Sequence, residues 1–158
     1  LFIGNLNAKR DWGHAKDYVK VMWMILQAEN PEDWVIATGK TNSVRDFIKA
    51  AFKHVGVEIE FKGEGLEEIG YVKSALNKDY CFKEGDELFN IDPKYYRPTE
   101  VDLLIGDATK AKEKSGWEPE ITFDELISEM MKSDLKNTEK EVLLSKKILV
   151  LVFLYLEG

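Results

Sequence analysis

Short apolar segments alternate with amphipathic helical patterns along this chain, and the alternation restricts its fold more than any other feature. Apolar side chains recur at helical spacing over residues 12–27, 44–55 and 123–135. Segments typical of strands lie at residues 1–4, 34–37, 57–61, 88–91 and 101–105. This order favours an α/β fold. The predicted strands are too few and too widely separated for a complete doubly wound sheet, so we expect part of a domain.

Local signals mark several helix ends. Ser43 with Asp46, and Thr122 with Glu125, match the capping-box pattern that begins a helix. A short helix over residues 109–115 is expected to end at Gly116. The helix over residues 12–27 presents one apolar face, which comprises Ala15, Tyr18, Val19, Met22 and Leu26.

Two segments fall outside the alternating pattern. Residues 62–87 are rich in glycine, lysine and glutamate without a clear period, which predicts a variable surface insertion. Residues 148–156 are nine consecutive apolar residues, far fewer than the roughly 20 that a membrane-spanning helix needs. They are either a buried terminal element or a sequence that does not belong to the domain. We therefore expect one region over residues 1–135 and an atypical tail over 136–158.

Charge and cysteine content exclude some classes of protein. The chain has 29 acidic and 22 basic residues and a formal net charge of −7, which does not fit a surface that binds nucleic acid. A local basic pocket for a small phosphorylated ligand is compatible with this balance. The single cysteine, Cys81, cannot form an internal disulfide, and the chain begins without a signal-peptide pattern. We therefore expect a cytoplasmic protein that does not associate with a membrane.

Several catalytic motifs are missing from the sequence. It contains no P-loop, no Tyr-x-x-x-Lys pair and no Gly-x-Ser-x-Gly elbow. Gly63 and Gly65 lie in the polar segment, not between a strand and a helix, so they do not form a dinucleotide-binding loop. His14, His54 and Cys81 do not have the spacing of metal ligands. We therefore expect no catalytic residue, no cofactor-binding residue and no metal ligand in the chain.

Two of the three arginines lie in segments suited to phosphate. In the first, a loop that begins at Gly4 and Asn5 leads to Lys9 and Arg10 immediately before a helix. Two cations and free backbone N–H groups suit a diphosphate. The alternative is that Arg10 forms an ion pair at the helix start, with Asp11 or with Asp17.

The second segment contains Arg97 and Glu100, which Pro98 places in an extended loop. An arginine for phosphate and a carboxylate for vicinal hydroxyls would suit a nucleotide sugar. The alternative is a structural ion pair between Arg97 and Glu100. The third arginine, Arg45, lies at a predicted helix start and is expected to be a surface or packing residue.

Five motifs from these regions, in the same order, resemble the GDP-mannose 4,6-dehydratase family. They are Gly4-Asn5-Leu6-Asn7-Ala8-Lys9-Arg10-Asp11-Trp12-Gly13-His14 and the residues up to Val19, Ala37-Thr38-Gly39, Ser43-Val44-Arg45-Asp46-Phe47, Tyr95-Tyr96-Arg97-Pro98-Thr99-Glu100-Val101-Asp102, and Gly106-Asp107-Ala108-Thr109-Lys110-Ala111-Lys112. The resemblance runs from about residue 1 to residue 135. It implies an extended short-chain dehydrogenase/reductase with a Rossmann-type fold, of which this chain is the C-terminal substrate-binding part without the N-terminal cofactor-binding part.

The resemblance also implies roles for individual residues. Arg10, with Lys9 beside it, corresponds to the arginine that binds the substrate diphosphate, and Gly4 and Asn5 lie near the nucleotide. Arg97 resembles the second phosphate-binding arginine. Glu100 resembles the acid that holds the ribose of GDP.

The family converts GDP-mannose to GDP-4-keto-6-deoxymannose with bound NADP, and its members form homo-oligomers, dimers or tetramers. Its catalytic Thr/Glu/Tyr/Lys set and its NADP-binding loop lie N-terminal to the matching region, so we expect the chain to be inactive alone. The match is poor over residues 63–86 and absent over 138–158. Two alternatives remain: another sugar-nucleotide epimerase or reductase of the extended class, or a non-catalytic fragment that binds nucleotide sugars.

Overall fold

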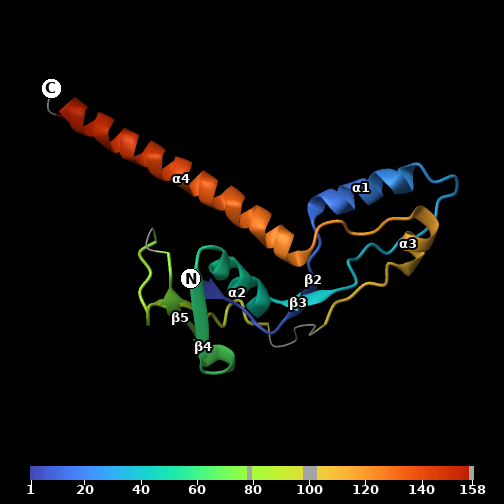
Figure 1. The fold of residues 1–158 in the computed structure, drawn as a ribbon, viewed down its shortest axis with the longest axis horizontal. Helices are drawn as coiled ribbons and strands as arrows, with labels where there is room; N and C mark the ends of the chain where they lie inside the picture. Colours follow the sequence, from blue (N-terminus) through green and yellow to red (C-terminus); the bar gives the residue numbers. More distant parts are fainter. Residues whose placement is uncertain (78–79, 98–102, 157–158) are drawn as a thin grey trace.

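A four-stranded sheet and a two-stranded ribbon, together with four α-helices, make up the described part of the chain (Figure 1). This computed structural model describes residues 1–77, 80–97 and 103–156, with side chains up to residue 145. The sheet has the order β1-β6-β5-β4. Its strands are β1 (Phe2–Ile3), β4 (Val57–Lys62), β5 (Ile69–Ala75) and β6 (Glu87–Ile91). Strand β1 pairs parallel with β6, and the other neighbours are antiparallel.

Strand β5 corrects the expectation that residues 62–87 are an irregular surface insertion. It lies between β4 and β6, and Val72 is fully buried. Gly70 is also buried, and a Cβ there would lie 2.2 Å from the ring of Phe89. A glycine at an inward position conceals the apolar alternation by which a strand is recognised. The short 3₁₀ helix η1 (Gly65–Glu67) leads into this strand.

Helix α2 (Val44–His54) packs against the sheet through Val44 and Ile48, which contact the cluster of Leu6, Phe89 and Ile91. Its predicted capping box is confirmed. Ser43 donates its hydroxyl and its backbone N–H to the carboxylate of Asp46, and these bonds lower the pKa of Asp46 below its ordinary value. The helix start is therefore held firmly in place.

The ribbon and two further helices form the second packed region. Strands β2 (Lys9–Asp11) and β3 (Thr41–Ser43) are antiparallel. Helix α1 (Ala15–Leu26) and helix α3 (Thr109–Ser115) confirm two predicted helices, and Gly116 ends α3 in the left-handed conformation, at φ +69°. The two helices meet through Val21, Ala111 and Trp117, which are almost fully buried.

The predicted strand at residues 34–37 is wrong. Trp34 and Ile36 pack into the cluster between α1 and α3, whereas Val35 is exposed. Within the described residues no backbone hydrogen bond joins this segment to another. Its neighbour is the segment around Gly106, where a Cβ would lie 2.7 Å from the Cβ of Ala37. An apolar run forms a strand only where an adjacent strand offers a ladder, and the described residues provide none here. Of the segment predicted at 101–105, residues 101–102 lie outside the described residues, and Leu103 forms a single bridge with Lys9.

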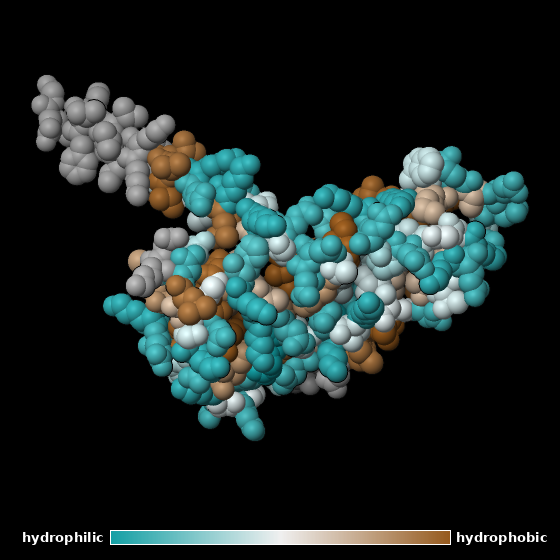
Figure 2. Space-filling model, viewed as in Figure 1, coloured by the Kyte–Doolittle hydropathy of each residue, from teal (hydrophilic) through white to brown (hydrophobic). Residues whose placement is uncertain are grey.

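Helix α4 (Phe123–Leu156) begins as predicted and ends much later than the expected position near residue 135. Thr122 and Glu125 form the expected capping box. No glycine or proline interrupts residues 123–156, so the helix continues past the domain and projects from it (Figure 1). Figure 2 shows a hydrophobic group on the projecting part, where Val142, Leu143 and Leu144 are exposed. None of the helices, as far as the structure describes them, combines the length and apolarity needed to cross a bilayer.

Helix α1 leaves most of its predicted apolar face exposed. Val19, Met22 and Leu26, with the adjacent Trp23, have between 61% and 80% of their surface accessible. The helix buries instead the side that carries Asp17, Val21 and Met24. Exposed apolar side chains that form one continuous stripe favour association.

We predict that the chain self-associates through this stripe. Replacing two of its residues, Trp23→Lys together with Leu26→Lys, should lower the average mass measured by light scattering during size-exclusion chromatography, because charged groups resist burial. Gln27→Lys, which adds the same charge at an exposed polar residue that follows the same helix, is the control. A wild-type chain that stays monomeric at high concentration would contradict this expectation.

Candidate functional site

A cavity of about 330 Å³ brings together four of the six predicted site residues. It lies between β1, the loop that follows β1, the start of α2 and the segment after β6. Gly4, Asn5, Arg10 and Arg97 line it, with Val44 and Tyr95 among the other lining residues. The two arginine-containing segments, which are far apart in the sequence, therefore meet at one site.

Gly4 allows this meeting. Its backbone passes so close to the segment after β6 that a Cβ would lie 2.4 Å from the carbonyl oxygen of Tyr95. Real Cβ atoms essentially never approach that closely, and backbone cannot move aside as a side chain can. Only glycine therefore fits where the loop after β1 crosses the segment after β6.

Hydrogen bonds fix the loop that follows Gly4. The Asn5 side-chain oxygen accepts from the backbone N–H of Asn7 at 2.9 Å. The carbonyl oxygens of Leu6 and Ala8 accept from the N–H groups of Arg45 and Val44, at 2.9 and 3.2 Å. Leu6 and Ala8 are themselves buried. The first turn of α2 therefore holds the loop through two backbone hydrogen bonds and through the packing of Val44 against the cluster that contains Leu6.

Arg45 is a packing residue, one of the two roles that the sequence leaves open for it. Its guanidinium forms an ion pair with the buried carboxylate of Glu68, with Nη2 3.0 Å from Oε2. It also donates to the side-chain oxygen of Asn7, from Nη2 at 2.9 Å and from Nε at 3.3 Å. The ring of Phe61 lies beneath it, with 4.5 Å from Cζ to the centroid. The sequence analysis did not predict that Arg45 joins Glu68 to Asn7, because these residues are far apart in the sequence and Glu68 lies in a segment without a recognisable period.

Arg10 lies in β2, and its Nη1 donates to the carbonyl of Lys9 at 2.8 Å. The alternative partners of Arg10 have other hydrogen bonds. Asp11 accepts from the N–H and hydroxyl of Thr38, at 3.1 and 2.7 Å, and from the N–H of Gly39 at 3.0 Å. Asp17 accepts from the N–H of Ile121 at 3.1 Å. These carboxylates organise neighbouring turns, so an ion pair of Arg10 with either of them is not supported.

The remaining predicted site residues differ in their placement. Arg97 is exposed at the rim of the cavity and, within the described residues, has no ion-pair partner. Lys9 is exposed on β2, where it pairs with Ser43, and it does not line the cavity. Glu100 lies outside the described residues, so both its predicted role and its alternative pairing with Arg97 stay predictions.

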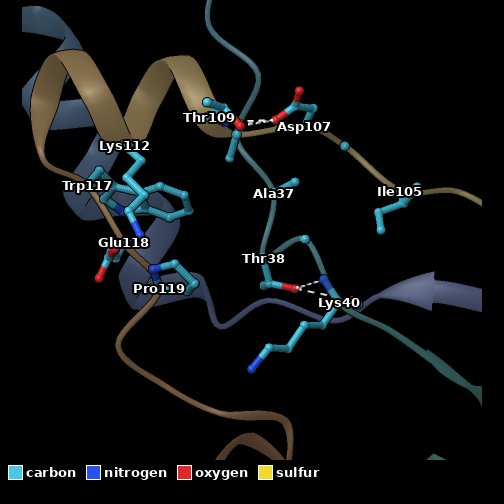
Figure 3. Close-up of a pocket in the computed structure, with 13 residues that line it drawn as sticks. Ala37, Thr38, Lys40, Ile105, Asp107, Thr109, Lys112, Trp117, Glu118 and Pro119 are labelled. Atoms are coloured by element: carbon cyan, nitrogen blue, oxygen red, sulfur yellow. Dashed lines mark hydrogen bonds and ion pairs between the residues drawn. The ribbon is translucent and has the colours of Figure 1, made fainter.

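Two larger cavities, of about 650 and 620 Å³, lie beside β3. Figure 3 shows the larger one, between the turn at Thr38 and the start of α3. Three of its charged side chains already have partners: Asp107 accepts from Thr109, and Lys112 pairs with Glu118. The side chain of Lys40 points away from α3 (Figure 3). The cavity of about 330 Å³, which Arg10 and Arg97 line, is the better candidate for an anionic ligand.

The described residues do not form a dinucleotide-binding loop. Gly63 lies just before the short 3₁₀ helix and Gly65 is its first residue, with φ of +85° and +59°. A Cβ on Gly63 would lie 2.3 Å from the carbonyl oxygen of Glu67, so this glycine serves a tight turn. Nor do any three metal-ligating side chains cluster in the described ranges.

Solved structures of two enzymes share the fold of this chain. A Thermotoga maritima UDP-glucose 4-epimerase, solved with UDP-glucose, matches with a TM-score of 0.61 and 22% identity, over 87% of this chain and 35% of the epimerase. RMD from Pseudomonas aeruginosa, solved with NADPH, matches with a TM-score of 0.58 and 14% identity, over 84% of this chain and 34% of RMD. These similarities show a mixed α/β fold that corresponds to about a third of each of these two proteins.

Sequence comparison identifies the family. The profile of the GDP-mannose 4,6 dehydratase family matches residues 1–130, and the chain belongs to this family. GDP-mannose 4,6-dehydratase of Yersinia enterocolitica is 50% identical over 146 residues, which are 91% of this chain and 39% of that protein. The Drosophila melanogaster enzyme is 53% identical over 138 residues, 87% of this chain and 33% of that protein. The Homo sapiens enzyme is 50% identical over 134 residues, which are 85% of this chain and 34% of that protein. The chain thus spans a third to two fifths of these relatives.

The crossing at Gly4 yields a prediction. Gly4→Ala should lower the free energy of unfolding by about 1–3 kcal/mol, the usual cost of overpacking, because neither backbone segment can yield freely. Urea denaturation measures the change. Gly65→Ala, where a Cβ would meet no atom within 4 Å, is the control, and it should cost about 1 kcal/mol for its backbone conformation alone. Equal stability of Gly4→Ala and wild type would show that the crossing is loose.

Proposed function

We propose that this chain is the C-terminal, GDP-sugar-binding part of a GDP-mannose 4,6-dehydratase, with residues 1–135 as the binding region and 136–158 as an additional tail. The observation that carries the proposal is the meeting of Gly4, Asn5, Arg10 and Arg97 at one cavity. Membership of the family supports the choice of ligand. The whole protein would convert GDP-mannose to GDP-4-keto-6-deoxymannose and act as a homo-oligomer.

In this proposal the chain binds and orients, and the chemistry belongs to groups outside it. The guanidinium groups of Arg10 and Arg97 neutralise the diphosphate, which a planar cation can hold by two parallel hydrogen bonds. The carboxylate of Glu100 accepts hydrogen bonds from the ribose hydroxyls. Asn5 keeps its amide N–H groups available for the nucleotide, because its oxygen is engaged by Asn7. NADP would supply hydride transfer from elsewhere in the whole protein, since the described residues offer no loop for it.

A second candidate is another sugar-nucleotide epimerase or reductase of the same class. The similarity in fold to UDP-glucose 4-epimerase favours it. However, identities near 50% to dehydratases from bacteria, insect and human favour the first candidate. A third candidate, a fragment that only binds nucleotide sugars, differs from the first in lacking any catalytic partner.

The 158-residue chain alone should show no NADP-dependent conversion of GDP-mannose, because the Tyr-x-x-x-Lys pair and the dinucleotide loop are absent from its sequence. The assay separates the product, GDP-4-keto-6-deoxymannose, by chromatography. A chimera in which this chain replaces the 146 matched residues of the Yersinia enterocolitica relative is the positive control. Turnover by the chain alone would refute the proposed division of roles.

In that chimera, Arg97→Ala should weaken GDP-mannose binding by about 1.5–3 kcal/mol, the scale of a hydrogen bond to a charged group. This corresponds to roughly a 10- to 150-fold rise in Kd, measurable by calorimetry. Lys94→Ala removes an exposed cation three residues earlier that does not line the cavity, and it should leave Kd nearly unchanged. If Arg97→Ala behaves like Lys94→Ala, Arg97 does not bind the diphosphate.

A further inference from the structure

We propose that Arg45 is a positioning residue for the nucleotide pocket, which it shapes through Asn7 without touching the ligand. The inference rests on the proposed function, because it concerns the affinity of that same pocket. It goes further in assigning a role to residues that do not line the cavity: Arg45, Asn7 and Glu68.

A continuous series of contacts leads from the sheet to the pocket. Glu68, buried immediately before β5, forms the ion pair with Arg45. Arg45 donates twice to the side-chain oxygen of Asn7. The backbone N–H of Asn7 is donated to the side-chain oxygen of Asn5, which lines the cavity. Each contact orients the next, so the position of the Asn5 amide depends on the guanidinium.

The geometry requires arginine in particular. Nε and Nη2 reach Asn7 while Nη1 and Nη2 reach Glu68, and the flat face rests on Phe61. A guanidinium has donors on two edges in one plane and can serve both partners at once. A lysine ammonium in the same place would keep its charge beside Glu68 and lose the fixed fork to Asn7. The loop would then retain its backbone bonds to α2 and lose its side-chain bond.

Asn7 allows a test that does not depend on the core. Its side chain is exposed, so replacing it disturbs packing little. Asn7→Ala removes the acceptor for Arg45, and Asn7→Asp keeps an acceptor at the same position. The capping residue Ser43 supplies the matched control, because Ser43→Ala weakens the start of the same helix and leaves Asn7 and Arg45 intact.

The experiment measures Kd and KM for GDP-mannose, together with kcat and Tm, in the chimera. Arg45→Lys and Asn7→Ala should each raise Kd and KM about 3- to 10-fold, the loss of one or two hydrogen bonds, with kcat nearly unchanged. The double variant should be little worse than either single variant, because both changes break the same connection. Asn7→Asp should restore affinity to within about two-fold. Ser43→Ala should lower Tm and leave Kd unchanged.

Distinct outcomes overturn distinct statements. If Asn7→Ala leaves Kd unchanged while Arg97→Ala raises it, the pocket binds the nucleotide and Arg45 has a structural role only. If Ser43→Ala raises Kd as much as Asn7→Ala does, loss of stability alone accounts for the weaker binding, and the positioning role is also refuted. If neither Arg97→Ala nor Asn7→Ala changes Kd, the proposed function itself fails. Should Arg45→Lys not fold, the two Asn7 variants decide the question.

Discussion

The ion pair between Arg45 and the buried Glu68 is the interaction on which the arrangement around the pocket depends. Removing one partner of a fully buried pair typically costs about 3–5 kcal/mol, because the other charge stays buried without compensation, and this part-buried pair should cost less. The guanidinium of Arg45 also donates to Asn7 and lies on the ring of Phe61. The pair joins the sheet, the start of α2 and the loop after β1. These three elements together form one wall of the cavity.

The crossing at Gly4 depends on close approach between backbones rather than on charge. Gly4 lets the first segment cross directly over Tyr95, which brings Arg10 and Arg97 to one cavity. The chain as a whole is acidic, with a formal net charge of −7. The two arginines at this cavity are therefore opposite in sign to the net charge of the chain, which supports the proposal of an anionic ligand there.

Local signals in the sequence predict local structure well here. The capping boxes at Ser43 and Thr122 and the terminator at Gly116 depend only on neighbouring residues, and all three are confirmed. Strand β5 and segment 34–37 depend on which strand lies alongside, and periodicity cannot supply that information. Likewise, the resemblance selected Gly4, Asn5, Arg10 and Arg97, whereas the link from Glu68 through Arg45 to Asn7 required the positions of three separate elements.

The unpaired segment at residues 34–37 has a thermodynamic consequence. Its backbone groups have no hydrogen-bond partner within the described part of the chain, and the neighbouring stripe on α1 is exposed. Main-chain groups without a protein partner are left to hydrogen-bond with water, so this segment adds less to the free energy of unfolding than a paired strand of the same length.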